Sequence, residues 1–179
     1  NTALHGEQVT KNVFHTEAGT VKCSTATFAG MTEEKVESEV TIEPTYGGCT
    51  AFGQSMIFHL NGCAYRLAEP TGTGPYHAAV AIECPTGAEI VIDVPSGNCS
   101  ITVGPQSPTG SVKLEDEGTT TARSILATLE LTGIAYAVHG PGQICGSIGP
   151  HTGASITGSV RLKGYESAPA IGQVGIWLE

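Results

Sequence analysis

Apolar and polar residues alternate in short runs along this chain, and the runs recur every 8 to 14 residues. Alternation of this kind is typical of β-strands with one buried face. The runs are separated by sequences rich in Gly and Pro, such as EPTGTGP and GPQSPTG, which favour turns. The predicted strands cover residues 20–28, 39–42, 55–60, 63–67, 78–84, 89–94, 99–103, 111–114, 124–131, 134–139, 155–162 and 173–178.

Helical patterns are nearly absent. Residues 31–39 are charged and lack an apolar stripe, and in 119–131 apolar side chains occupy every other position from Ile125 to Leu131, which favours a strand. Evenly spaced strands without βαβ units predict an all-β fold. We expect an antiparallel β-sandwich of the jelly-roll or Greek-key type, with a β-barrel as the alternative. The length of 179 residues suits a single domain, 1–179, with a loose two-part division near 85–98.

Two pairs of similar segments lie within the chain. LNGCAYRL at 60–67 resembles LTGIAYAV at 131–138, and TGSVKL at 109–114 resembles TGSVRL at 157–162. Asn-Gly favours the positive backbone angles of a two-residue hairpin turn, so hairpins are predicted across Asn61-Gly62 and, by analogy, across residues 132–133. The first pair repeats an apolar face on which Cys63 matches Ile134, so we interpret it as hairpin scaffolding and expect Cys63 to be buried.

The six cysteines are widely and singly spaced, with no C-x-x-C pair, so structural zinc and thioredoxin chemistry are disfavoured. An even number in a charge-poor β-type chain predicts three disulfides and an oxidising compartment, extracellular or at the cell surface. Buried free cysteines are the alternative. The expected pairs are Cys23–Cys49, Cys63–Cys84 and Cys99–Cys145, out of 15 possible connectivities.

The net charge is −9, from 17 acidic and 8 basic residues, and the basic residues form no cluster. Nucleic-acid binding requires such clusters, so no nucleic-acid partner is expected. Membrane insertion is not expected either, because no apolar run approaches the roughly 20 residues of a spanning helix. The chain begins at Asn1, which suggests a processed or trimmed chain.

No catalytic signature is recognisable, and we expect neither an enzyme nor a cofactor or metal. The G-x-S-x-G elbow is missing, and no acid is singled out to orient a histidine. His139 and His151 flank a glycine-rich stretch, where turns beside a disulfide are favoured over a paired-histidine metal or pH-sensing site. The acidic runs 33–43 and 115–117 are interpreted as solvated loops rather than glycosidase carboxylates or a calcium site. A hydrolase with a motif-free triad is the third hypothesis.

Two groups of residues are candidates for contacts with partners. The C-terminal Val174, Ile176, Trp177 and Leu178 make both faces of a strand apolar, which predicts burial inside the domain or homo-oligomeric or filament assembly. A strand at 7–15 could take part in the same way. For a carbohydrate- or ligand-binding module, the aromatic platform would be Tyr46 with Phe52, or Tyr76 with Trp177. Asn98 lies in an N-C-S sequence that fits N-glycosylation.

VKCSTATFAG at 21–30, PTYGGCTAFG at 44–53 and NGCAY at 61–65 resemble a group of small exported bacterial proteins without an assigned function. The resemblance covers the first half of the chain through Cys84 and, more loosely, the rest. It implies export and disulfides, and it brings no catalytic residues. The sequence therefore predicts a secreted, non-enzymatic structural or cell-surface interaction protein that self-assembles through its terminal strands, with a carbohydrate- or ligand-binding module as the alternative.

Overall fold

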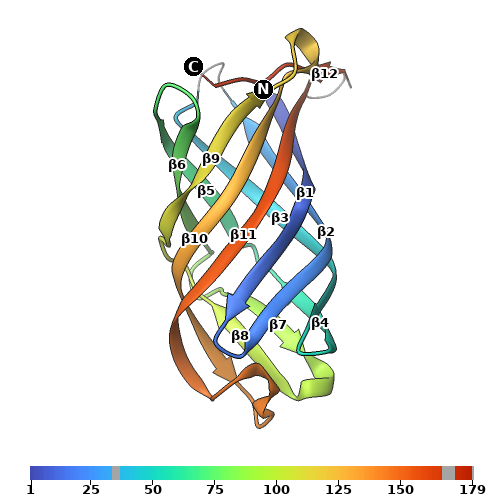
Figure 1. Cartoon of the computed structure of the whole chain (residues 1–179), viewed down its shortest axis with the longest axis vertical. Helices are drawn as coiled ribbons and strands as arrows, with labels where there is room; N and C mark the ends of the chain where they lie inside the picture. The colour runs from blue at the N-terminus through green and yellow to red at the C-terminus, as the bar shows by residue number, and fades with distance from the viewer. Residues whose placement is uncertain (34–36, 167–171, 179) are drawn as a thin grey trace.

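The computed structural model describes residues 1–33, 37–166 and 172–178, and their regular structure is almost entirely β-strand (Figure 1). Three single-turn 3-10 helices, η1 to η3, lie between strands. The strands are β1 (Thr2–Thr16), β2 (Gly19–Thr32), β3 (Glu39–Ala51), β4 (Gln54–His59), β5 (Ala64–Thr71), β6 (Tyr76–Glu83), β7 (Ile90–Val94), β8 (Cys99–Val103), β9 (Thr109–Glu117), β10 (Ser124–His139), β11 (Gly149–Glu166) and β12 (Gln173–Val174). The 3-10 helices are η1 (Pro95–Gly97), η2 (Thr120–Ala122) and η3 (Gln143–Cys145).

The strands form a closed antiparallel barrel rather than a sandwich. Eight strands close the ring in the order β1-β2-β3-β5-β6-β9-β10-β11, and β11 pairs with β1 again. The all-β expectation is confirmed, the sandwich is wrong and the barrel alternative is right. Strands in which apolar and polar residues alternate fit a sandwich and a barrel equally well. Closure of the barrel depends on the pairing of β1 with β11, which lie near opposite ends of the chain, and no local sequence pattern reveals that pairing.

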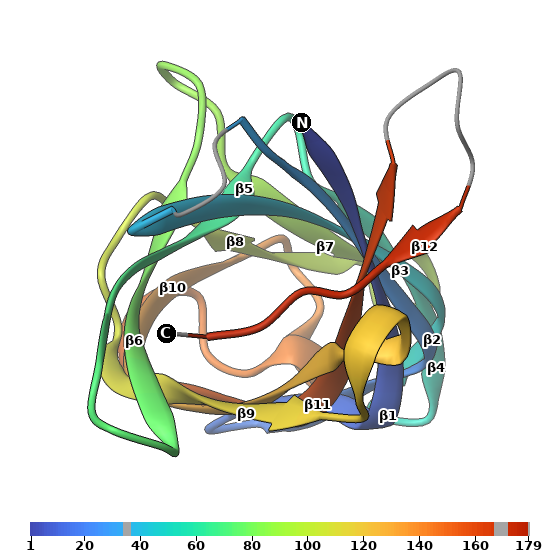
Figure 2. The same ribbon diagram turned by 90° about the horizontal axis from the view of Figure 1, so that it is seen from above.

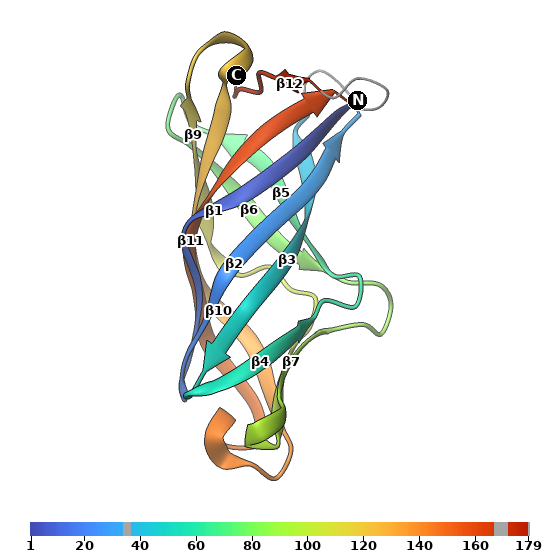
Figure 3. The ribbon, with the colours of Figure 1, turned by 90° about the vertical axis from the view of Figure 1, so that its right-hand side faces the viewer.

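Two long strands fork and divide the barrel into two halves. At one end β3 pairs with β5 and β10 pairs with β9, whereas at the other end β3 pairs with β4 and β10 pairs with β8. The upper half therefore contains β5, β6 and β9, and the lower half contains β4, β7 and β8 (Figures 1 and 3). We call the two branch points the β3 fork (residues 43–48) and the β10 fork (residues 133–136).

Both predicted hairpins are wrong, for different reasons. Asn61 and Gly62 do form a turn with positive φ angles of 52° and 82°, and the Cys63 amide donates to the Leu60 carbonyl at 2.8 Å. The flanking strands β4 and β5 nevertheless pair with other strands, because this turn leads from the lower to the upper half. Thr132-Gly133 is not a turn: Gly133, with φ of 67°, lies at a β-bulge in the continuous strand β10.

The second repeated segment has a clear place in the barrel. TGSVKL lies on β9 and TGSVRL on β11, and these two strands flank β10 on its opposite sides. The second residue of each copy is a glycine with positive φ, Gly110 at 108° and Gly158 at 156°. The similar segments therefore perform the same structural task on the two sides of one strand.

Small residues let the side chains fill the barrel interior. A Cβ added to Gly6 would lie 2.8 Å from Cδ2 of Leu162 and 2.8 Å from Cβ of Phe28, so no larger residue fits there without a shift. Cys63, Tyr65, Ile134, Tyr136 and Val138 are buried, which confirms the inward face predicted for LNGCAYRL and LTGIAYAV. Interiors packed in this way resist changes of even one methylene group.

The three disulfides join the predicted pairs. Cys23–Cys49 connects directly opposite residues of β2 and β3, Cys63–Cys84 connects the start of β5 to the end of β6, and Cys99–Cys145 connects β8 to η3. The described residues contain no free cysteine. Three disulfides indicate folding in an oxidising, extracellular-type environment.

The C-terminal segment crosses the upper opening of the barrel (Figure 2). β12 pairs with the end of β11, through Val174 opposite Gly164. Ile176 and Leu178 pack against the core, and the Leu178 amide donates to Oδ1 of Asp116 at 3.1 Å. Within the part of the chain that the structure describes, no helix is long and apolar enough to cross a membrane.

Candidate functional site

A serine, a histidine and a glutamate from distant parts of the chain meet at the lower end of the barrel. His151 on β11 places Nδ1 3.2 Å from Oε2 of Glu17, which lies in the turn between β1 and β2. Its Nε2 lies 3.5 Å from Oγ of Ser147 and 2.7 Å from the Ser147 carbonyl oxygen. The ring stacks on Tyr136 with centroids 5.0 Å apart, and the Tyr136 hydroxyl accepts the Glu17 amide at 3.3 Å.

This cluster has the residue types of a catalytic triad but not its hydrogen bonding. In a triad, the histidine Nδ1–H donates to the acid while Nε2 is free to take the serine proton. Here the shorter contact of Nε2 is to a carbonyl oxygen, which only accepts hydrogen bonds, so Nε2 carries a hydrogen and donates it. The observed arrangement therefore ties the loop before β11 to the β1–β2 turn and does not activate Ser147.

The two histidines considered in the sequence have different partners. His139 Nε2 lies 3.1 Å from Oγ1 of Thr102, whereas His151 contacts Glu17 and Ser147. Among the described residues, no group of three or more His, Cys, Asp or Glu side chains could hold a metal ion. The structure therefore offers no contact that joins the two histidines in one site.

The acidic runs lie on the surface and take part in ion pairs. Glu117 receives Nε of Arg161 at 2.8 Å, and Glu39 receives NH1 of Arg66 at 2.8 Å. Positions 34–36 of the run 33–43 lie outside the described residues. The described carboxylates are solvated, as expected, but the expected loops are wrong, because Glu39 and Glu43 lie on β3 and residues 115–117 lie on β9.

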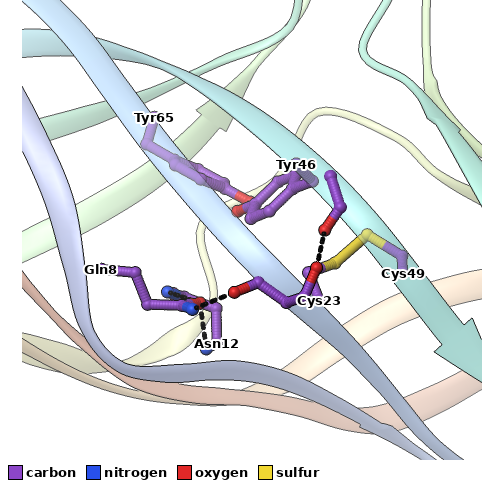
Figure 4. The surroundings of a disulfide bond; sticks show 8 residues. Gln8, Asn12, Cys23, Tyr46, Cys49 and Tyr65 are labelled. Carbon is purple, nitrogen blue, oxygen red and sulfur yellow. Dashed lines mark hydrogen bonds between the residues drawn. A yellow bond between two sulfur atoms is a disulfide. The ribbon is translucent and has the colours of Figure 1, made fainter.

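A second cluster lies in the barrel interior behind the β3 fork. The hydroxyl oxygens of Tyr46 and Tyr65 are 2.9 Å apart (Figure 4). The centre of the Tyr46 ring lies 4.8 Å from that of the Phe58 ring. Burial, followed by the neighbouring Tyr65, raises the pKa of Tyr46 well above its usual value. Burial also raises the pKa of Tyr65, and its hydrogen bond to Tyr46 opposes that rise. Both hydroxyls are therefore neutral over the ordinary pH range.

The cavity at this cluster has a volume of about 40 Å³. Pockets for small organic ligands typically enclose several hundred Å³. This cavity therefore has room for small solvent molecules only.

The four residues of the predicted aromatic platforms have different environments. Tyr46 is half-buried and faces the interior, Phe52 lies half-buried in the turn between β3 and β4, and Tyr76 is half-buried at the start of β6. Trp177 is 49% exposed, and the Arg123 guanidinium lies 5.4 Å from the centre of its ring. Carbohydrate binding by these residues stays a prediction.

The other predicted residues occupy distinct positions. Val174, Ile176 and Leu178 are half-buried and Trp177 is exposed, but only Gln173–Val174 of the predicted strand 173–178 is a strand, β12, and residues 175–178 have no regular structure. Asn98 is exposed after η1 with a φ of 49°. These placements leave assembly and glycosylation as predictions.

Two glutamines that the sequence did not single out replace backbone groups where strand pairing is interrupted. At the β10 fork, Gln106 Oε1 accepts the Ala135 amide at 2.7 Å, and its Nε2 donates to the Ala135 carbonyl at 2.8 Å. At the bulge in β1, Gln8 Oε1 accepts the Asn12 amide at 3.0 Å, and its Nε2 donates to the Ser24 carbonyl at 3.2 Å. The side-chain amide of glutamine has an N–H donor and a C=O acceptor, as a peptide group does. It can therefore take the place of a missing backbone partner in a sheet.

No protein-family model matches the chain, and no curated protein or solved structure is significantly similar to it.

Proposed function

We propose that this protein is a secreted, non-enzymatic structural or cell-surface interaction protein that acts through the outer surface of its barrel. The observation that carries the proposal is the filled interior, whose cavity of about 40 Å³ is too small for an organic ligand. Three disulfides support an exported location, because such bonds persist in oxidising compartments. The resemblance to exported bacterial proteins supports the same location.

Self-assembly is the more specific form of the proposal, and it depends on the C-terminal segment. The N-terminal strand β1 is paired along both edges, with β11 and with β2, so it has no free edge to offer to a neighbouring copy. By contrast, β12 pairs only with β11 among the described strands, and Trp177 beside it is 49% exposed. An exposed tryptophan beside an open strand edge is typical of interaction surfaces.

We expect the protein to form oligomers or filaments as its concentration rises. Trp177→Ser should shift the equilibrium between monomer and oligomer towards the monomer at least about tenfold, because a central tryptophan contributes roughly 2 kcal/mol to an interface. Light scattering coupled to size exclusion, with negative-stain microscopy, measures this. Ile57→Ser is the matched control, since Ile57 is 52% exposed on β4 in the lower half. A monomer at all concentrations, or equal effects of both substitutions, would contradict assembly through the C-terminal segment.

A hydrolase is the second candidate, because Glu17, His151 and Ser147 do meet in space. The hydrogen bond from Nε2 to the Ser147 carbonyl argues against it, and we expect no labelling of the protein by a fluorophosphonate probe. Mass spectrometry of the treated protein checks this expectation. Labelling that disappears in Ser147→Ala but persists in Ser96→Ala would overturn the non-enzymatic proposal.

A further inference from the structure

The cavity behind the β3 fork is large enough for water. Its volume is about 40 Å³, and one water molecule needs roughly 10–15 Å³ of such space. Most of its lining is apolar, but Asn12, Tyr46 and Tyr65 contribute polar groups. A cavity holds water only where polar partners are present, so the hydrogen bonds of these three side chains decide what it binds.

Asn12, one of the residues that line the cavity, has a side-chain acceptor without a donor. It lies at the bulge in β1 and is only 5% exposed. Its backbone amide and its Nδ2 both donate to Oε1 of Gln8, at 3.0 and 3.2 Å (Figure 4). These bonds fix the orientation of the amide, because a flipped Asn12 would place Oδ1 against another acceptor. Oδ1 is therefore buried, and no described residue donates to it.

The tyrosine pair brings a hydrogen without an acceptor to the same cavity. The hydroxyls of Tyr46 and Tyr65 lie 2.9 Å apart, and either can donate to the other. Both keep their hydrogens, because burial raises both pKa values. One hydrogen is used within the pair, and the second has no acceptor among the hydrogen bonds of the described residues. A buried donor and a buried acceptor that are left unpaired both destabilise the folded state.

We propose that this cavity is a water-binding site, in which about two ordered water molecules connect Asn12 Oδ1 to the Tyr46–Tyr65 hydroxyl pair. Water accepts the spare tyrosine hydrogen and donates to Oδ1, so it satisfies both groups at once. The water molecules join β1 to β3 and β5 across the barrel at the level of the fork. This site is independent of the proposed function, since it concerns the interior and not the outer surface.

NMR of the full chain tests the proposal through the nuclear Overhauser effect between water and protein hydrogens. We expect negative cross-peaks, which indicate bound water with a residence time longer than nanoseconds, at the side-chain amide of Asn12 and at the tyrosine hydroxyls. Tyr65→Phe keeps the shape of the cavity but removes one hydroxyl, and it should weaken the water cross-peaks at Asn12 at least about twofold. Tyr76→Phe is the matched control, since Tyr76 does not line the cavity, and it should leave these cross-peaks unchanged.

Asn12→Leu removes the acceptor, and in a folded variant it should abolish the long-lived water. If Asn12→Leu does not fold, Tyr65→Phe still tests the proposal, because it leaves the hydrogen bonds between Asn12 and Gln8 unchanged. Absence of long-lived water at Asn12 in the unsubstituted protein overturns the proposal. Shifts of the Ile82 and Val103 methyl signals under xenon, without water cross-peaks, would identify a dry cavity instead, because empty apolar cavities bind xenon.

Discussion

Loss of the Cys99–Cys145 bond, through the paired substitutions Cys99→Ala and Cys145→Ala, is expected to lower the free energy of unfolding by about 4 kcal/mol. A disulfide stabilises a protein mainly by restricting the unfolded chain, and the effect grows with the length of the closed loop. This bond spans 46 residues, against 26 for Cys23–Cys49 and 21 for Cys63–Cys84. Both sulfur-bearing residues are buried, 7% and 1% exposed, so the substitutions also leave a small void.

The bond matters locally because it holds the lower end of the barrel together. Cys145 belongs to η3, and the preceding Gly142 donates its amide to the Asn98 carbonyl at 3.1 Å. Without the disulfide, this single hydrogen bond and the packing of Ile144 would have to keep η3 against η1 and β8. We therefore expect the residues from Gly140 to Ser147 to lose protection from hydrogen exchange first.

Urea unfolding of the variant and of the unsubstituted protein measures the difference. The matched control is Cys63→Ala with Cys84→Ala, for which the shorter loop predicts about 3.3 kcal/mol, and half-buried Cys84 adds little void. A larger loss in the control than in the Cys99 and Cys145 variant, or a loss below about 1 kcal/mol in the latter, would show that the disulfides do not stabilise the barrel chiefly by restricting the unfolded chain.

Several features of the fold could be predicted from the sequence because they depend on local patterns. Residues 124–131 form a strand, as the alternation from Ile125 to Leu131 predicts, and Cys63 is buried in a disulfide. The predicted disulfide pairing is also confirmed, since each bond joins cysteines that follow one another along the chain. A strand and its buried face need only side-chain periodicity to be recognised, whereas the spacing of six cysteines does not by itself select one of the 15 pairings.

Features that depend on distant pairing could not be predicted. Asn61-Gly62 has the turn chemistry of a hairpin, but its flanking strands find partners in different halves of the barrel. Thr132-Gly133 has similar chemistry and becomes a bulge, because β10 already has neighbours on both sides. The choice between turn and bulge is made by tertiary pairing, to which a local sequence signal contributes little.

The candidate sites also combine residues that a local pattern reveals with residues that only distant pairing brings together. The sequence identified His151 as unusual, but its partner Glu17 is 134 residues away, and nothing in the spacing selects that glutamate. The cavity joins Asn12 with Tyr46 and Tyr65, which lie on three separate strands. A glutamine that takes the place of a peptide group leaves no sequence signal at all, because its role exists only where the barrel leaves a gap.

Gln106→Leu is expected to lower the free energy of unfolding by about 1 kcal/mol, because it removes two hydrogen bonds to the Ala135 backbone at a site that is open to water. Gln106 lies at the β10 fork, where β10 changes its pairing partner from β9 in the upper half to β8 in the lower half. Its backbone pairs with Ile82 at the end of β6, with N–O distances of 2.7 and 3.0 Å, while its side chain pairs with Ala135 on β10. One residue thus connects β6 to β10 where neither β9 nor β8 does so.

The specific readout is hydrogen exchange at the Ala135 amide, which should lose its protection in Gln106→Leu even where global stability remains sufficient. Gln143→Leu is the matched control, because Gln143 is exposed, and it should change stability by less than about 0.5 kcal/mol.

Gln106→Glu is a second test of the same bridge. In the unsubstituted protein Nε2 of Gln106 donates to the Ala135 carbonyl oxygen at 2.8 Å, and at pH 7 a carboxylate oxygen would stand there instead, with one acceptor facing another. Since only the protonated acid can donate to that carbonyl, the stability of this variant should recover as the pH falls below about 4. Unchanged protection of Ala135 in Gln106→Leu would show that the fork is closed by packing alone, and the glutamine bridge would then have no energetic role.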